Sequence, residues 1–86
     1  MSYSIRIRKQ ALKEIEKLPL KNSLEISKTI DNLSIEPRPV GCKKLKGQSE
    51  TIWRIKVGDF RILYIIEDKI KIVEIRKIGN RKDVYK

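Results

Sequence analysis

The segment RIKVGDFRILY, residues 54–64, determines the centre of the fold because it has the pattern of a β-hairpin. Apolar and polar residues alternate on both sides of Gly58 and Asp59, as in two strands that each bury one face. A glycine at the first position of a two-residue turn favours the type II′ geometry. Such a turn places Lys56 directly opposite Arg61.

This register runs from Val57 opposite Phe60 to Trp53 opposite Tyr64, and it sorts the side chains onto two faces. The apolar face is expected to meet the core and holds Trp53, Ile55, Val57, Phe60, Ile62 and Tyr64. The other face carries three cations beside two aliphatic residues that we expect to be exposed: Arg54, Lys56, Arg61, Leu63 and Ile65.

The three cations on one face call for an explanation, because like charges directly opposite each other destabilise a sheet. Folding alone gives no reason to pair Lys56 with Arg61. An anion bound between them does, and cations on adjacent strands suit a phosphate. The alternative is a solvated edge whose cations point into water. A cationic, partly apolar sheet face is typical of a surface that binds single-stranded nucleic acid.

Two helices are predicted before the hairpin. Residues 3–8 alternate like a half-buried strand, and from Lys9 the apolar residues follow helical spacing until Pro19 breaks the run. A second helix is expected over roughly 20–34, so that the two form an αα-hairpin. Residues 36–50 are expected to form a loop.

Three strands follow that loop, at about 51–57, 60–67 and 70–78. The order β-α-α-β-β-β predicts an α+β fold, with two helices on one face of a small, mainly antiparallel sheet. Eighty-six residues suit a single domain, here 1–86.

The charge predicts an anionic partner. The net charge is +10, and residues 41–86 carry 13 Lys/Arg against 6 Asp/Glu. A basic domain of this kind most often meets nucleic acid or an acidic protein. We expect no membrane partner, since no apolar run reaches about 18 residues. With no signal peptide expected and Cys42 as the sole cysteine, a cytoplasmic location is predicted.

The chain has no histidine, so histidine-based acid–base chemistry is excluded, and no cofactor or metal site is expected. Cleavage of nucleic acid would then depend on Lys, Arg and Tyr, which RNA permits because its 2′-hydroxyl can attack the adjacent phosphate. A lysine crowded by two arginines has a lowered pKa, so Lys56 is a candidate base. In the tail, Arg81 and Tyr85 can reach the sheet and supply charge, a stacking ring or a hydroxyl. A frayed basic terminus is the alternative.

The pattern KKLKG…WRIKVGDFRILYII…KIVEIRKIGNRKDVYK resembles the RelE/ParE toxin superfamily of bacterial and archaeal toxin–antitoxin modules, and most of all its RelE branch. The resemblance covers nearly the whole chain. It implies two helices packed on a curved antiparallel sheet, and a toxin that cuts mRNA in the ribosomal A site. It also implies a cognate antitoxin, often acidic and extended.

The family's active-site positions fall on five residues of this chain: Arg54, Lys56, Arg61, Arg81 and Tyr85. The first position is often lysine in the family, and an arginine there keeps the charge but weakens any role as a proton carrier. Lys56 is then the expected base, Arg54 and Arg61 bind the scissile phosphate, and Arg81 stabilises charge or protonates the leaving oxygen. Tyr85 positions the 2′-hydroxyl or stacks on a base.

A basic cluster in the loop, Lys43, Lys44 and Lys46, is expected to grip ribosomal RNA, unless it is simply a solvated loop. Two other functions remain open. A ParE-like protein would bind DNA gyrase on the same fold, but would not need the clustered cations and the Arg81/Tyr85 tail. A non-enzymatic RNA-binding module would tolerate Lys56→Arg, because affinity needs only charge.

Overall fold

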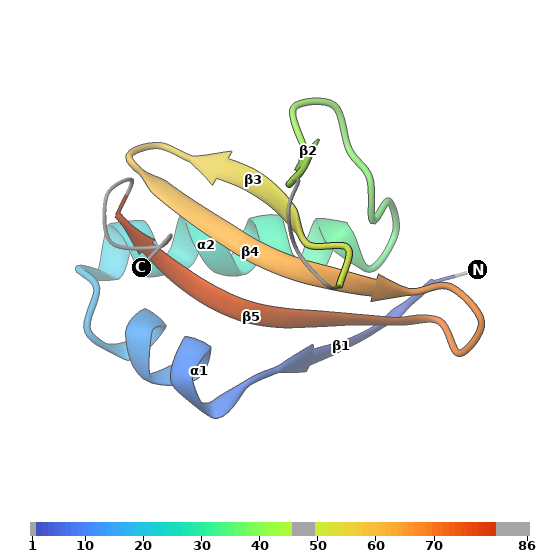
Figure 1. The fold of residues 1–86 in the computed structure, drawn as a ribbon. Coiled ribbons are helices and arrows are strands. Elements are labelled where there is room, and N and C mark those ends of the chain that lie inside the picture. The colour runs from blue at the N-terminus through green and yellow to red at the C-terminus, as the bar shows by residue number, and fades with distance from the viewer. Residues whose placement is uncertain (1, 46–49, 81–86) are drawn as a thin grey trace.

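The computed structural model describes residues 2–45 and 50–80, and these form two helices and five strands (Figure 1). In chain order the elements are β1 (Ser4–Ile7), α1 (Lys9–Glu16), α2 (Leu20–Leu33), β2 (Lys43–Lys44), β3 (Trp53–Val57), β4 (Phe60–Glu67) and β5 (Ile72–Asn80). Neither helix in these residues is long and apolar enough to cross a membrane. The predicted α+β class is confirmed, and the predicted order β-α-α-β-β-β holds except for the additional strand β2.

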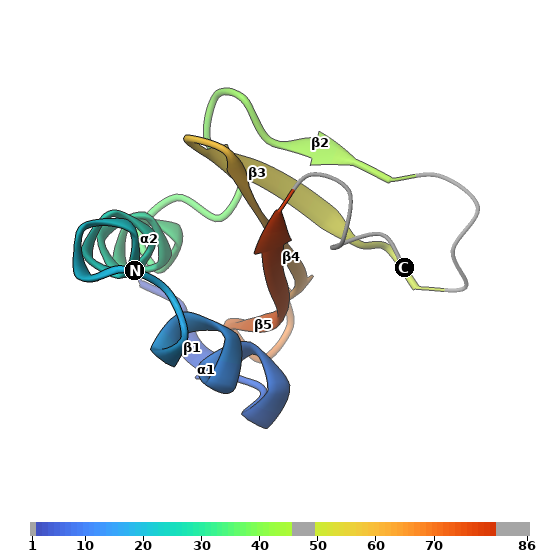
Figure 2. The same cartoon turned by 90° about the vertical axis from the view of Figure 1, so that its left-hand side faces the viewer.

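The five strands form one sheet in the order β1-β5-β4-β3-β2. β1 runs parallel to β5, whereas the other three pairs are antiparallel, which confirms a mainly antiparallel sheet. Both helices lie on the same side of this sheet (Figure 2). The opposite face of β3, β4 and β5 therefore has no helix packed on it.

The β3–β4 hairpin has the predicted register, from Val57 opposite Phe60 to Trp53 opposite Tyr64. Gly58 has a φ of 61°, and among the described residues only Lys71 combines a side chain with a positive φ. Asp59 therefore has a negative φ. This combination fits the type II′ turn and excludes type I′, which needs positive φ at both central positions.

The core lies between the helices and one face of the sheet. Its fully buried members come from both helices and from β4 and β5: Ala11, Ile26, Ile30, Leu33, Ile62, Tyr64, Val73, Ile75 and Ile78. The rest of the hairpin's predicted core face packs against them partly buried: Trp53, Ile55, Val57 and Phe60. The helical spacing of Ile26, Ile30 and Leu33 puts them on one stripe of α2, as an amphipathic helix requires.

A hydrogen bond from the sheet to α1 completes this packing. Beyond Ile75, β5 has no further partner in β1, so the backbone N–H of Ile78 would lack an acceptor on that side. The side chain of Glu14 accepts it at 2.9 Å. The Glu14 carboxylate of α1 thus accepts the hydrogen bond that a neighbouring strand would otherwise accept.

Three details differ from the sequence prediction. The loop over 36–50 contains the short strand β2, whose existence depends on pairing with β3 rather than on its own residues. The last strand begins at Ile72 and ends at Asn80, since residues 68–71 form the turn that precedes it. The strand expected from 51 begins at Trp53.

The expectation that Leu63 and Ile65 are exposed was wrong, because each is only 8% exposed. β4 lies between β5 and β3, so it has neighbours on both sides. Leu63 lies in one cross-strand row with Arg54 and Lys77, whose long side chains flank it.

Candidate nucleic-acid interface

The hairpin brings the three predicted cations together on the face that the helices leave uncovered. Lys56 lies directly opposite Arg61, and Arg54 precedes Lys56 by two residues on the same side of β3. Their environments differ: Lys56 is exposed, Arg54 is half-buried and Arg61 is only 6% exposed. Holding a buried guanidinium in a sheet costs free energy unless its charge is balanced, which favours an anion here.

Arg54 gives a second sign of an absent partner. Its Nε is the only buried side-chain nitrogen or oxygen in residues 2–45 and 50–80 that has no hydrogen-bond partner. A buried donor left without an acceptor costs about 1–3 kcal/mol. This donor lies in the same cationic group as Lys56 and Arg61, as expected for a site where a bound ligand would accept the missing hydrogen bond.

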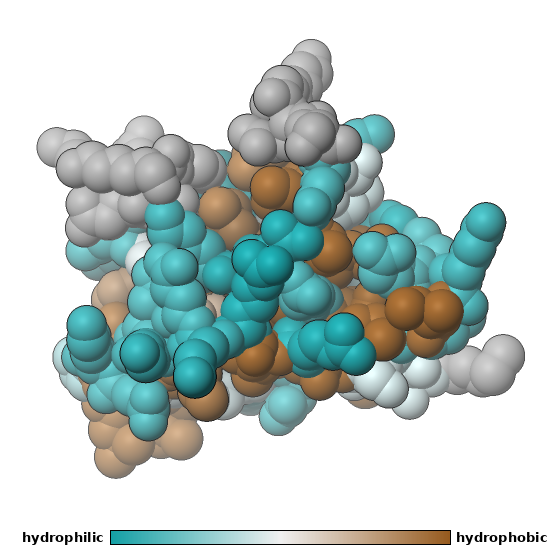
Figure 3. All heavy atoms as spheres, turned by 60° about the horizontal axis from the view of Figure 1, so that its bottom comes forward, coloured by the Kyte–Doolittle hydropathy of each residue, from teal (hydrophilic) through white to brown (hydrophobic). Residues whose placement is uncertain are grey.

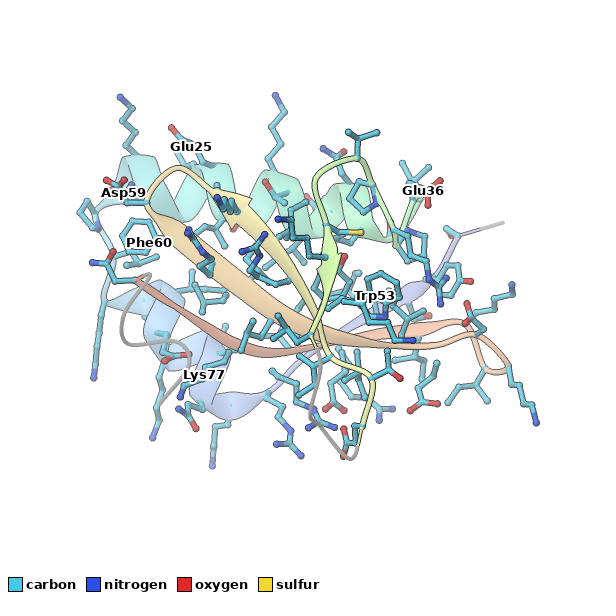
Figure 4. The ribbon with its side chains drawn as sticks, turned by 45° about the horizontal axis from the view of Figure 1, so that its top comes forward. Glu25, Glu36, Trp53, Asp59, Phe60 and Lys77 are labelled. Carbon is cyan, nitrogen blue, oxygen red and sulfur yellow. The ribbon has the colours of Figure 1, made fainter. Side chains whose placement is uncertain are left out.

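A hollow of about 460 Å³ lies at the hairpin end of the sheet, and its lining includes two of the three cations. The lining residues are Asn22, Lys56, Gly58, Asp59, Phe60, Arg61 and Asn80. Figure 4 labels Asp59 and Phe60 at this end and Trp53 at the other. Asn22 and Asn80 were not predicted from the sequence, because their proximity depends on how α2 and β5 meet the hairpin.

The described lysines of the predicted basic cluster lie on opposite faces of the sheet. Lys43 pairs with Arg54 and lies on the cationic face, whereas Lys44 pairs with Trp53 and lies on the opposite face. Both are exposed. Lys46, the third predicted member, lies outside the described residues, as do Arg81 and Tyr85.

The hollow reaches the end of the last strand. Asn80 lines it and pairs with Phe60. Arg81 is the next residue in the sequence.

Lys77 is a cation of this face that sequence reasoning missed. Leu63 pairs with Lys77, but the next residue, Tyr64, pairs with Ile75, so Arg76 is an extra residue in β5. Strict alternation from the core residue Ile75 would have put Lys77 in the core. The β-bulge moves it to the cationic face, and no local sequence signal marks that bulge.

At the other end of this face the cations are paired with acids. Nε of Arg76 and Oε1 of Glu74 are 2.5 Å apart, and Arg76 also contacts Glu50 at 2.6 Å. Arg8 contacts Glu74 at 3.2 Å. Figure 3, which turns the lower side of Figure 1 forward, shows hydrophilic side chains across this side with apolar ones between them. Acids balance the charge of these cations.

A separate polar cluster fastens the strand ends near Trp53. Arg38 contacts Asp68 at 2.8 Å and lies 5.2 Å from the centroid of the Trp53 ring, as in a cation–π interaction. The Tyr3 hydroxyl donates to Asp68 at 2.7 Å. The hydrogen bonds from Arg38 and then Tyr3 lower the pKa of Asp68 to about 2. This cluster joins the residue before β1, the loop after α2, the strand β3 and the turn after β4, and it lies away from the hollow, so we assign it to stability.

Known proteins with the same fold identify the class. The family model described as "ParE toxin of type II toxin-antitoxin system, parDE" matches residues 5–85. The "Putative toxin RelE1" of Methanocaldococcus jannaschii is 34% identical over 89 residues, which cover 100% of this chain and 98% of that protein. The "Toxin RelG" of Mycobacterium tuberculosis is 30% identical over 87 residues, covering 100% and 99%.

The solved structures agree with the sequence relatives. In the crystal structure of the archaeal RelE–RelB complex from Pyrococcus horikoshii OT3, the matching chain has a TM-score of 0.84 and 30% identity, over 98% of this chain and 100% of that one. These matches define a toxin of type II toxin–antitoxin systems. The chain belongs to the RelE/ParE superfamily and is similar to its RelE branch.

Proposed function

We propose that this toxin is a metal-independent endoribonuclease that cleaves mRNA in the ribosomal A site and so inhibits translation. The observation that carries the proposal is the cross-strand pair of Lys56 and Arg61 on the uncovered face, with Arg54 beside it and a hollow at the hairpin end that both Lys56 and Arg61 line. Like charges held opposite each other stabilise a bound polyanion at the expense of the free fold.

The reaction we propose uses the RNA's own nucleophile. The 2′-oxygen forms a bond to phosphorus and loses its proton to Lys56, while the bond from phosphorus to the 5′-oxygen breaks. The leaving oxygen takes a proton, and the products are a 2′,3′-cyclic phosphate and a 5′-hydroxyl. Two guanidiniums on the scissile phosphate, from Arg54 and Arg61, stabilise the charge of the transition state. DNA has no 2′-hydroxyl and is not a substrate for this route.

The tail completes the proposed site. Arg81 stabilises charge and protonates the 5′-oxygen, and Tyr85 positions the 2′-hydroxyl or stacks on a base; both roles rest on the resemblance. Lys43, Lys44 and Lys46 contribute to ribosome binding. Of Lys43 and Lys44, Lys43 is the better placed, because its pairing with Arg54 puts it beside the proposed phosphate site.

We also propose that the toxin binds a cognate antitoxin. The archaeal relative was solved as a complex with RelB. An acidic, extended antitoxin would complement the net charge of +10 and cover the cationic face.

A second candidate function is inhibition of a DNA topoisomerase, because the matching family model is named for ParE. Such a toxin needs this fold but not a phosphate site. The orphaned donor of Arg54 and the buried charge of Arg61 therefore favour the ribonuclease.

The deciding experiment adds the purified toxin to a translating extract and maps new mRNA 5′ ends by primer extension. We expect cuts in register with codons that appear only when ribosomes are present. Lys56→Arg should abolish them, because arginine keeps its proton at neutral pH. Lys69→Arg, the same exchange in the exposed turn before β5, is the control.

One outcome tests the role of Lys56, and another tests the function itself. Cleavage by Lys56→Arg at the wild-type rate would remove Lys56 as the base. An intact message with the wild-type toxin would refute the ribonuclease, and a DNA supercoiling assay would then test topoisomerase inhibition.

A further inference from the structure

The cationic face extends onto a third long strand. Cross-strand pairing aligns Lys43, Arg54, Leu63 and Lys77 in one row, and Lys56, Arg61 and Gly79 in the next. Paired residues of antiparallel strands point to the same side of the sheet. Lys77 therefore lies on the same face as Arg54 and Arg61, diagonal to Arg61. Figure 4 shows it at the same end of the sheet as Asp59 and Phe60.

The cations of this face lie on three neighbouring strands. Arg54 and Lys77 are two strand intervals apart, about 10 Å between backbones. Arg54, Lys56 and Arg61 occupy adjacent positions on β3 and β4 and can share one phosphate. Lys77 lies beyond Leu63 and meets a different one.

The charge pattern also limits where the RNA backbone can run. In the next row toward the turn before β5, Ile65 pairs with Glu74. Glu74 and Glu50 already hold Arg76, and a second hollow of about 330 Å³ there includes Glu50 and Glu67 in its lining. A phosphate would meet carboxylates in that region. The backbone therefore crosses the strands at the hairpin end, from β3 over β4 to β5.

We infer that Lys77 binds a phosphate that flanks the scissile one, so that the single-stranded RNA crosses the sheet between Lys56 and Lys77. This inference rests on the proposed ribonuclease function. A lysine ammonium has three donors, so Lys77 can keep an intramolecular contact and still bind a phosphate oxygen. Lys77 is a substrate-binding and not a catalytic residue, because the reacting atoms lie between β3 and β4.

The test pairs a protein substitution with a neutralised phosphate. Messages carrying an uncharged methylphosphonate at either phosphate flanking the cleavage site are cleaved in the ribosome-containing mixture by wild-type toxin, Lys77→Gln and Lys69→Gln. We expect Lys77→Gln to lower kcat/KM about tenfold on the unmodified message, mainly through KM. Lys69→Gln, with the same charge change in the turn, should match the wild type.

Coupling between the two changes identifies the contact. At one flanking position, the methylphosphonate should slow wild-type toxin about tenfold but leave Lys77→Gln nearly unaffected, because the contact is already lost. Lys77→Arg keeps the charge and should recover most of the activity that Lys77→Gln loses, which guards against a loss caused by misfolding.

Two failures are distinguishable. The wild-type toxin could cleave the unmodified message while the effects of Lys77→Gln and of the methylphosphonate on kcat/KM multiply at both flanking positions. In that case the assignment of Lys77 is wrong and the ribonuclease stands. If the wild-type toxin does not cleave the unmodified message, the ribonuclease and this inference are refuted together.

Discussion

At the scale of single residues, Tyr64 shows how a core side chain fixes a loop. It is fully buried, and its hydroxyl donates to the carbonyl of Pro37 at 2.8 Å. Burial raises the pKa of Tyr64 well above its ordinary value, so the hydroxyl stays a donor. Tyr64→Phe leaves that carbonyl without its donor and should lower the free energy of unfolding by about 1–2 kcal/mol in urea titrations. Tyr3→Phe removes an exposed hydroxyl bond instead and should cost less; equal losses would contradict the role of burial.

Asp68 gives a residue-scale prediction in pH. Hydrogen bonds from Arg38 and Tyr3 hold its folded pKa at about 2, below the ordinary carboxyl value of about 3.9. A lowered folded pKa means that Asp68 contributes stability above the unfolded pKa and loses it as the pH falls through the folded one. Asp68→Asn should thus have a lower Tm than the wild type at pH 7, and the two Tm values should converge between about pH 4 and pH 2. A constant difference across that window would show that the charge of Asp68 does not matter.

At the residue scale, the sequence predicted which face of the hairpin carries the cations but not how deeply each cation is buried. The alternation around Gly58 was enough to place Arg54, Lys56 and Arg61 on one face, because side-chain direction in a hairpin follows from the turn. It could not show that Arg61 is almost fully buried, since that depends on the strands on both sides of β4. The position of Lys77 was not predicted for a similar reason, because a bulge in the pairing with β4 determines on which face of the sheet its side chain lies.

At the scale of elements, the β3–β4 hairpin depends on the conformation of its first turn residue. Gly58 has a φ of 61°, and a Cβ added there would meet nothing within 4 Å. Gly58→Ala should therefore cost about 1 kcal/mol from backbone strain alone, without a steric clash. Gly58→Asn should cost less, because asparagine tolerates positive φ better. Urea titrations of both variants measure this order, and an equal or larger loss in Gly58→Asn would point to a contact of Gly58 that the structure does not show.

The elements that sequence reasoning predicted have strong local signals. The helices have a stripe of apolar residues, and the hairpin has a Gly-Asp turn between alternating runs. β2 has no such signal: it is two lysines that become a strand only because β3 offers its edge. The same holds for the start of β5, where a turn with Lys71 at positive φ takes residues whose apolar character suggested a strand.

At the scale of the whole molecule, the positive charge that suits an anionic partner works against the free fold. Twenty-one cations and 11 acids leave a net charge of +10, and self-repulsion in so small a protein destabilises the compact state. Raising NaCl from about 10 mM to 150 mM shortens the Debye length from about 30 Å to 8 Å. The ion pairs of Arg38 and Arg76 weaken under the same screening, so the sign of the salt effect shows which contribution is larger. Because cations outnumber acids, we expect the Tm of the antitoxin-free toxin to rise with NaCl in thermal scans. A fall in Tm would mean that the ion pairs outweigh the net repulsion.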